Sequence, residues 1–158
     1  MKKYVLTVSR TFLKTHKRAE QQTNFIYKIL KSQNLLIDNF EYEPKLHTIR
    51  GNYELWSKRI KEVQEGTAVL CIRYWSGKPY NSKQVEFCVL DKDSGVGVQK
   101  LEFVNNIFHI CIDGKWNCCD VKDLAKNDGL SFDDFCEWFK GYDLTDPMAI
   151  IHFTKFRY

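Results

Sequence analysis

The sequence predicts an α+β fold, in which a small, mostly antiparallel barrel carries helices at its periphery. Apolar, β-branched runs recur at close spacing along the chain, as the strands of a small sheet do. The helical segments are inserted between these runs and do not alternate with them one for one, which disfavours a doubly wound parallel sheet. The chain has 158 residues, of which 44% are hydrophobic and 15% aromatic, enough for one ordered core. We therefore predict a single domain over residues 1–158.

The first 44 residues predict a strand, a polar loop, a helix and a connection. Residues 4–8 are apolar and β-branched, which indicates a strand, and residues 9–23 are polar and basic. Apolar residues recur at helical spacing over residues 25–33, which predicts a helix. Residues 35–44 mix apolar and acidic side chains and read as the connection that follows it.

The middle of the chain begins with a longer helix. Residues 53–64 carry apolar side chains near helical spacing, and Gly66 is a typical helix stop. Residues 68–72 then predict a strand. Residues 74–80 are rich in aromatic residues and contain Gly and Pro, which predicts a loop.

The remaining elements are predicted by the same signals. Gly, Asn and Asp turn residues separate three strands, which are expected at residues 84–90, 96–104 and 107–112. Short helices are expected at residues 121–126 and 131–139. Ser131 is an N-cap for the second helix, with an acidic residue three positions later. Residues 149–153 close the domain as an apolar strand.

Residues 45–50, Lys-Leu-His-Thr-Ile-Arg, are unusually polar for a strand built only for packing. In an extended chain Thr48 and Arg50 share one face, whereas Lys45 and His47 lie on the other. Lys45 and Thr48 therefore meet at one site only if Lys45 belongs to the turn before the strand. An edge strand with solvated charges is the alternative.

The motif Lys-x-x-Thr-Ile-Arg at residues 45–50 resembles the signature of the ASCH family, a branch of the PUA-like proteins. A second match is Asp128, a carboxylate shortly before the helix that opens with Ser131. The apolar stretch at residues 148–156 is similar to the strand with which family members end. In this order the motifs span residues 45–158, and the resemblance implies a PUA-like pseudo-β-barrel.

The resemblance also implies a set of catalytic residues. Lys45, Thr48 and Asp128 match the Lys, Thr and acidic positions of ASCH members that are amidohydrolases on N4-acetylcytidine. The chemistry is coherent, because a partly desolvated lysine has a lowered pKa and can act as a base. A threonine hydroxyl needs such a base to become a nucleophile, and a carboxylate can orient the lysine. The family's acid is Glu where this chain has Asp128.

The charge of the chain is uneven. Residues 1–83 hold 16 Lys and Arg against 7 Asp and Glu, whereas residues 84–158 hold 8 against 13, which together give the net charge of +4. A basic half is a reasonable footprint for a phosphate-bearing partner. The alternative is that the two halves interleave in the fold, so that their charges cancel.

Basic and aromatic residues together predict a nucleic-acid surface, because single-stranded binders pair a basic groove with aromatic platforms for the bases. The residues predicted to contact the ligand are Arg50, His47, Arg10, Lys17, Arg18, Arg73, Trp75, Lys78 and Tyr80. Lys14 and Tyr74 belong to the same surface. The alternatives are a solvated basic loop and a buried Trp75 that only anchors its loop.

The predicted function is binding of RNA, of a nucleotide or of a modified nucleoside in a cleft beside residues 45–50. An amidohydrolase acting on an N-acylated pyrimidine nucleoside is the first alternative, which leaves open whether the protein is an enzyme. A protein-interaction domain with an idle cleft is the second. The sequence does not specify the oligomeric state.

No cofactor and no metal are expected. The six cysteines, at positions 71, 88, 111, 118, 119 and 136, lack the spacing of a zinc site. Cys71, Cys88 and Cys111 lie in strand-like apolar runs and are expected to be small buried residues, with all six thiols reduced. No apolar run approaches the roughly 20 residues that span a bilayer, so we expect a cytoplasmic protein without membrane contact.

Overall fold

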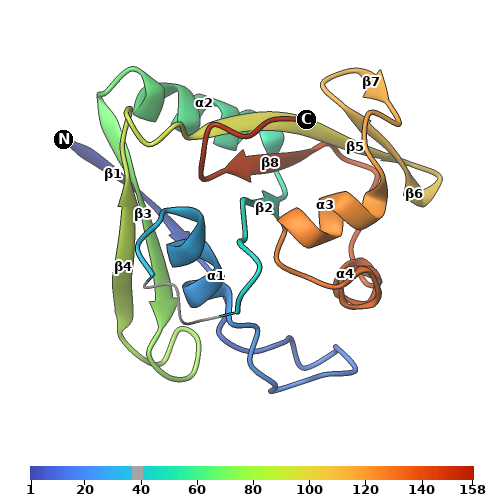
Figure 1. Cartoon of the computed structure of the whole chain (residues 1–158), viewed down its shortest axis with the longest axis horizontal. Coiled ribbons are helices and arrows are strands. Elements are labelled where there is room, and N and C mark those ends of the chain that lie inside the picture. The colour runs from blue at the N-terminus through green and yellow to red at the C-terminus, as the bar shows by residue number, and fades with distance from the viewer. Residues whose placement is uncertain (37–40) are drawn as a thin grey trace.

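The structure is a computed structural model that describes residues 1–36 and 41–158, and it confirms the α+β prediction (Figure 1). The helices are α1 (Phe25–Ser32), α2 (Tyr53–Gln64), α3 (Val121–Asn127) and α4 (Phe132–Phe139). The strands are β1 (Lys2–Thr7), β2 (His47–Arg50), β3 (Ala68–Trp75), β4 (Gln84–Leu90), β5 (Gly97–Val104), β6 (Asn106–Ile112), β7 (Lys115–Trp116) and β8 (Met148–His152).

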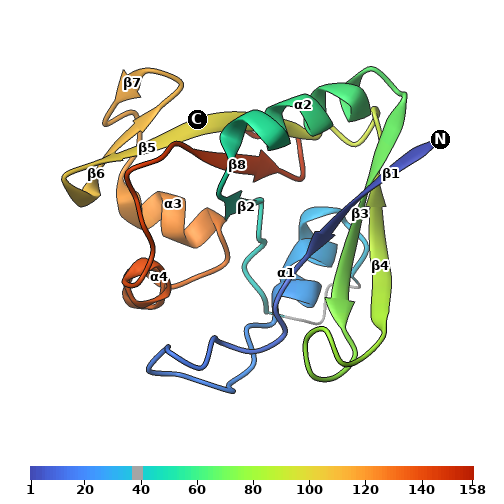
Figure 2. The ribbon, with the colours of Figure 1, turned by 180° about the vertical axis from the view of Figure 1, so that it is seen from behind.

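The strands form two separate sheets. One has the order β1-β3-β4, and the other has the order β2-β8-β5-β6-β7. The β1–β3 pair is parallel, whereas the other pairs of these strands are antiparallel. Within the described residues the two sheets do not close into a barrel, so the predicted barrel is replaced by two open sheets. Figures 1 and 2 show the first sheet on one side of the molecule and α3 and α4 on the other, with α1 and β2 between them.

Helix α2 joins the two sheets over one core. It contacts β3 of the first sheet and β5 and β8 of the second. Its apolar stripe consists of Trp56, Ile60 and Val63, all buried. The Asn52 side chain caps the helix by accepting a hydrogen bond from the backbone N–H of Leu55 at 3.1 Å. The amphipathic pattern read from the sequence therefore places α2 across both sheets.

Strand β8 lies in the middle of the second sheet and is buried along its whole length. It pairs with β2 on one side and β5 on the other, so that His152 stands opposite His47 and also opposite Gly97. A strand that has neighbours on both edges and is buried on both faces typically has a continuous apolar sequence, as β8 does. Strand β2, in contrast, is an edge strand among the described strands and pairs there with β8 alone, which suits its polar sequence.

The structure differs from the predicted elements in two places. Strand β3 continues through Tyr74 and Trp75, which were predicted to be loop residues, because it pairs with β4 as far as Trp75 and Gln84. A register shift between Ile72 and Arg73 allows this continuation. The short strand β7 was not predicted; it folds back on β6 through the Asp113–Gly114 turn, where both residues have positive φ.

The segment at residues 35–44 was predicted to be a connection. Residues 37–40 of that prediction lie outside the described residues, and those described on either side are neither helix nor strand. Among the described residues no helix is long and apolar enough to cross a membrane.

The position of α2 predicts a large effect for Ile60, a fully buried residue of this helix. We expect Ile60→Ala to lower the free energy of unfolding by about 2–5 kcal/mol, because it leaves a cavity where the helix meets the sheets. Urea unfolding followed by circular dichroism measures the change. Lys58→Ala, at an exposed position of the same helix, is the matched control and should change stability by less than about 0.5 kcal/mol. Equal effects of the two substitutions would contradict this packing.

Candidate functional site

A small cavity of about 170 Å³ lies where β1, β2 and the helices meet. Polar groups come from the predicted motif and from the end of α3, and apolar and aromatic groups come from α1 and α4. The lining residues are Thr7, Val8, Ser9, Leu13, Phe25, Lys45, Thr48, Ile49, Arg50, Asp128, Leu130, Trp138, Phe139 and Tyr142. The structure thus brings Lys45, Thr48, Arg50 and Asp128 together around one cavity.

Lys45 reaches this cavity because it lies outside the strand. β2 begins only at His47, and the backbone before it bonds to other elements: the Lys45 N–H donates to the carbonyl of Lys28 at 3.0 Å. The Leu46 N–H donates to the carbonyl of Asn127 at 2.8 Å. Strict strand alternation therefore does not apply to Lys45, and its side chain lines the same cavity as Thr48.

Lys45 and Asp128 form a buried ion pair. The Lys45 Nζ lies 2.9 Å from Oδ1 of Asp128 and also donates to the backbone carbonyl of Asp128. It stands 4.3 Å from the centroid of the Phe25 ring, within the range of a cation–π contact. Lys45 is 1% exposed and Asp128 is 5% exposed. Removing one partner of such a pair leaves an uncompensated buried charge, which is strongly destabilising.

The end of α3 is shaped to present Asp128. Gly129, with φ +81°, follows the helix, and its N–H donates to the carbonyl of Lys126 at 2.9 Å. The Leu130 N–H donates to the carbonyl of Ala125 at 3.0 Å, which completes a Schellman motif. A Cβ on Gly129 would stand 3.2 Å from the methylenes of Lys45. Glycine is required here both for its backbone conformation and for the close approach of the lysine stem.

The two members of the pair are both charged at neutral pH. Burial lowers the pKa of Lys45 to about 8, with Arg50 and Lys28 adding to the decrease and Asp128 opposing it. Burial by itself would raise the pKa of the Asp128 carboxyl, but the positive charge of Lys45 and the contact with His47 hold it below its usual range. A lysine that loses its proton near pH 8 can act as a base in slightly alkaline solution.

Thr48 and Arg50 complete the polar wall from one face of β2. Thr48 is buried, and its register partner across the ladder is Ile151 of β8. The Arg50 guanidinium donates through Nη2 to the carbonyl of Thr7 at 2.7 Å, which ties the end of β1 to β2. A guanidinium has five N–H donors, so this contact leaves Arg50 with donors for a ligand in the cavity.

His47, which was predicted to contact the ligand, lies behind the cavity and is not one of its lining residues. It is fully buried on the opposite face of β2, with Nδ1 3.6 Å from Oδ1 of Asp128. Its Nε2 lies 2.7 Å from the hydroxyl of Tyr158, which also accepts from Nδ2 of Asn127 at 3.0 Å. Burial lowers the pKa of His47, which favours the neutral ring. His47 therefore lies close to Asp128, but its Nδ1 has no hydrogen-bond partner among the described residues.

His152 packs beside His47 in the same buried layer. The two ring centroids are 5.4 Å apart, and Tyr158 lies against both rings. Neither ring nitrogen of His152 has a hydrogen-bond partner among the described residues, and burial strongly lowers the pKa of this ring. No sequence signal links Tyr158 to residue 47 or residue 152, because only the tertiary fold brings the end of the chain to these strands.

A second pocket, of about 430 Å³, adjoins the cavity. It shares Thr7, Val8 and Ser9 with the cavity lining. Its other lining residues are Arg10, Thr11, Trp75, Gly77, Lys78, Pro79 and Tyr80. Four of the predicted ligand-binding residues, Arg10, Trp75, Lys78 and Tyr80, are therefore grouped beside the predicted catalytic ones. We call this second pocket the outer pocket.

The other predicted basic residues do not join this group. Arg18 is paired with Asp134 of α4 at 2.5 Å, and Arg73 is paired with Glu86 of β4 at 2.9 Å. The Arg18–Asp134 pair holds the loop at residues 9–24 to α4, together with the buried His16, whose Nε2 contacts the carbonyl of Asp134 at 3.1 Å. The single basic surface predicted from the sequence is therefore divided.

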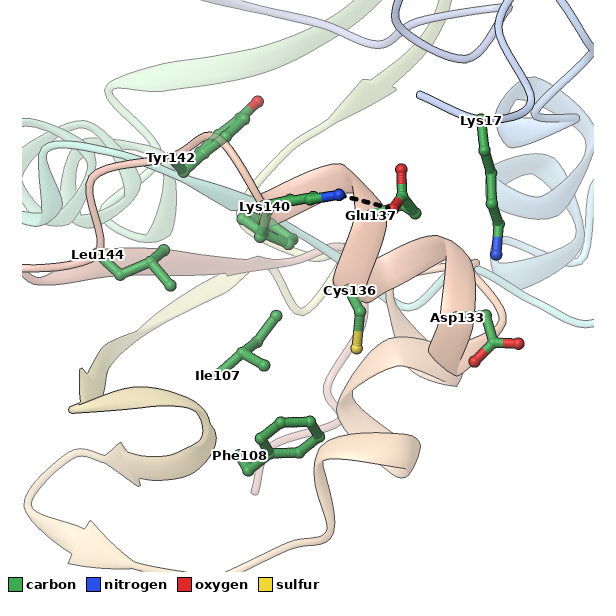
Figure 3. A pocket seen from close by; sticks show the side chains of 10 residues that line it. Lys17, Ile107, Phe108, Asp133, Cys136, Glu137, Lys140, Tyr142 and Leu144 are labelled. Carbon is green, nitrogen blue, oxygen red and sulfur yellow. Dashed lines mark ion pairs between the residues drawn. The ribbon is translucent and has the colours of Figure 1, made fainter. Parts of the chain in front are cut away.

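Lys17 lies at a third pocket, of about 500 Å³, between α4, the segment after it and β6 (Figure 3). Its floor is apolar, with Ile107, Phe108 and Leu144. Its rim carries charges of both signs, and Lys140 is paired with Glu137 at 3.6 Å. Because the rim carries both signs of charge, this lining favours neither an anionic nor a cationic ligand.

The cysteines are all free thiols. Cys71, Cys88 and Cys111 are buried, which confirms their predicted place in apolar strands. Over residues 1–36 and 41–158, no group of three or more His, Cys, Asp and Glu side chains is arranged to hold a metal ion.

Comparison of the chain with protein-family models, with curated proteins and with solved structures gave no significant match. Function is therefore inferred from the geometry of the cavity.

The lowered pKa of Lys45 predicts a pH dependence of stability. Lys45 keeps its proton to pH 10.5 in the unfolded chain but only to about pH 8 in the fold, so the unfolded state binds more protons between these values. Its contribution to stability therefore rises with pH across this window. From pH 8 to 9.5 we expect wild type to gain on the order of 1–2 kcal/mol relative to Lys45→Met. Urea unfolding at the two pH values measures the difference.

Lys58→Met, at an exposed site, is the control for this experiment and should keep the wild-type slope of stability against pH. If Lys45→Met and wild type show the same slope, Lys45 is not a buried lysine with a lowered pKa.

Proposed function

We propose that the protein is an ASCH-type, PUA-like amidohydrolase that releases the acyl group from an N-acylated pyrimidine nucleoside such as N4-acetylcytidine. The observation that carries this proposal is the meeting of Lys45, Thr48 and Asp128 at one cavity, with Lys45 and Asp128 in direct contact. A buried ion pair costs free energy of desolvation. Its presence beside an empty volume therefore favours a functional site over an idle cleft.

The size of the cavity supports a substrate that enters only in part. A volume of about 170 Å³ is below the roughly 300–1,000 Å³ of pockets that enclose a whole drug-sized ligand. It corresponds to roughly six water molecules at about 30 Å³ each, a space that suits a single small ring. The base would enter the cavity, and the sugar would remain towards the outer pocket.

The roles of the residues follow from their charge states. Above pH 8 the neutral Lys45 takes the proton of the Thr48 hydroxyl, whose oxygen attacks the acyl carbon. The C–N bond to the base breaks, and Lys45 returns the proton it took from Thr48 to the exocyclic nitrogen, which leaves as the free amine. Water then cleaves the acyl–threonine ester, which returns Thr48 and gives a carboxylic acid. Asp128 orients Lys45, and Arg50 donates hydrogen bonds to the carbonyl oxygen that gains charge.

A second candidate is a binding domain without turnover. The observation that favours it is the engagement of Lys45, which below pH 8 is protonated, donates two of its three N–H groups to the carboxylate and the carbonyl of Asp128, and lies against Phe25. A lysine held in this state is a hydrogen-bond donor for a base. The same cavity would then bind RNA, a nucleotide or a modified nucleoside.

Incubation with N4-acetylcytidine and detection of cytidine by chromatography tests the proposal. We expect turnover that rises with pH through about 8, as Lys45 loses its proton. Thr48→Val, which removes the hydroxyl at nearly constant shape, and Lys45→Met should each lower kcat at least 100-fold, because nucleophile and base act together. Thr48→Ser retains a hydroxyl and is the matched control that should keep measurable turnover.

Circular dichroism and urea unfolding establish that each variant is folded. If folded wild-type protein forms no cytidine at any pH from 7 to 9.5, the proposal that it is this enzyme is wrong. Saturable binding of N4-acetylcytidine without product would support the binding domain in its place.

A further inference from the structure

The outer pocket and the cavity lie side by side, because Thr7, Val8 and Ser9 line both. A ligand whose base lies in the cavity has the outer pocket within reach over these three residues. The volume of the outer pocket, about 430 Å³, is within the range of pockets that hold a small ligand. The sugar of a nucleoside borders this second volume and does not fill it.

The charged residues that line the outer pocket, Arg10 and Lys78, are both cationic. The Arg10 guanidinium is oriented by its bond to the carbonyl of Ser76 at 2.9 Å and lies 5.4 Å from the Tyr74 ring centroid. Arg18 and Arg73 are neutralised by acids, but no acidic side chain of residues 1–36 and 41–158 lines this pocket. Two cations beside a cavity for a base are the arrangement that a phosphate group requires.

Two aromatic rings line the outer pocket. Trp75 and Tyr80 have ring centroids 5.2 Å apart, and Tyr80 is 87% exposed. Tyr80 also has φ 64°, a strained backbone conformation for a bulky residue, and such strain is concentrated at functional sites. An exposed aromatic ring beside a cationic pocket is a stacking platform for a nucleic-acid base.

We propose that the outer pocket is a phosphate-and-stacking subsite, so that the substrate of the cavity is a nucleotide within a single-stranded oligonucleotide. This inference rests on the proposed function for the base in the cavity. The phosphate lies at Arg10 and Lys78, and the neighbouring base stacks on Tyr80. The free nucleoside places its base in the cavity and contacts neither cation, whereas a mononucleotide also contacts the two cations.

Three ligands separate these contributions: N4-acetylcytidine, its 5′-monophosphate, and a uridine pentanucleotide with N4-acetylcytidine at its centre. Binding is measured by isothermal titration with wild type, Lys78→Ala and Tyr80→Ala, and turnover is measured in parallel. Lys115→Ala, an exposed lysine on β7, is the control for loss of one positive charge. Each variant is first verified to be folded by its urea unfolding curve.

We expect the pentanucleotide to bind wild type at least tenfold more tightly than the nucleoside, with affinity that falls as salt rises. Lys78→Ala should weaken both phosphate-bearing ligands several-fold and leave the nucleoside unchanged. Tyr80→Ala should weaken only the pentanucleotide, by roughly tenfold, because only this ligand offers a second base. Lys115→Ala should change none of the three affinities.

The outcomes distinguish this inference from the proposed function. The subsite proposal is overturned if the three ligands bind with equal affinity, or if Lys78→Ala and Lys115→Ala change the affinities equally. This holds even if the nucleoside is hydrolysed. Tight, salt-dependent binding of the pentanucleotide that is lost in Tyr80→Ala supports the subsite even if no ligand is hydrolysed. If the monophosphate binds more tightly than the nucleoside but the pentanucleotide binds no more tightly than the monophosphate, the phosphate contact is supported. The proposal that the substrate is an oligonucleotide is then overturned.

Discussion

The buried ion pair between Lys45 and Asp128 is the interaction on which the candidate site depends. Its partners are far apart in sequence, and each is held by a different element: Asp128 by the turn that ends α3, and Lys45 by the segment that leads into β2. Because an unpaired charge at this depth is strongly destabilising, the pair fixes the distance between these two elements. The cavity lies beside this ion pair, and its chemistry depends on the burial of both charged groups.

The surrounding structure keeps the pair in place from several sides. The Leu46 N–H donates to Asn127, and the Phe153 N–H donates to the Leu46 carbonyl, so the segment before β2 is bonded to both α3 and the end of β8. Lys28 donates to the Gly129 carbonyl at 2.8 Å from the side of α1. Behind the pair lie His47 and Tyr158. These contacts come from both ends of the chain, which is why the site is assembled only in the complete fold.

The uneven charge of the chain has a definite structural role. Three cations of the basic first half, Arg18, Arg73 and Lys45, are each paired with an acid of the second half. These three pairs neutralise part of the charge difference between the two halves. Arg10 and Lys78 escape this cancellation, and they lie together at the outer pocket. A local positive region beside a cavity remains, and it is the feature on which recognition of a phosphate-bearing ligand depends.

The sequence by itself determined the α+β class, the helices and most strands, because these depend on apolar periodicity and on local cap and turn residues. It also placed Lys45, Thr48, Arg50 and Asp128 in one candidate site through a resemblance. Only the tertiary structure decided that Lys45 precedes the strand and lines the same cavity as Thr48, and that His47 lies on the opposite face. It also decided that Arg18 and Arg73 form ion pairs and that the two sheets stay open. These features depend on contacts between residues far apart in the chain, which local sequence patterns do not encode.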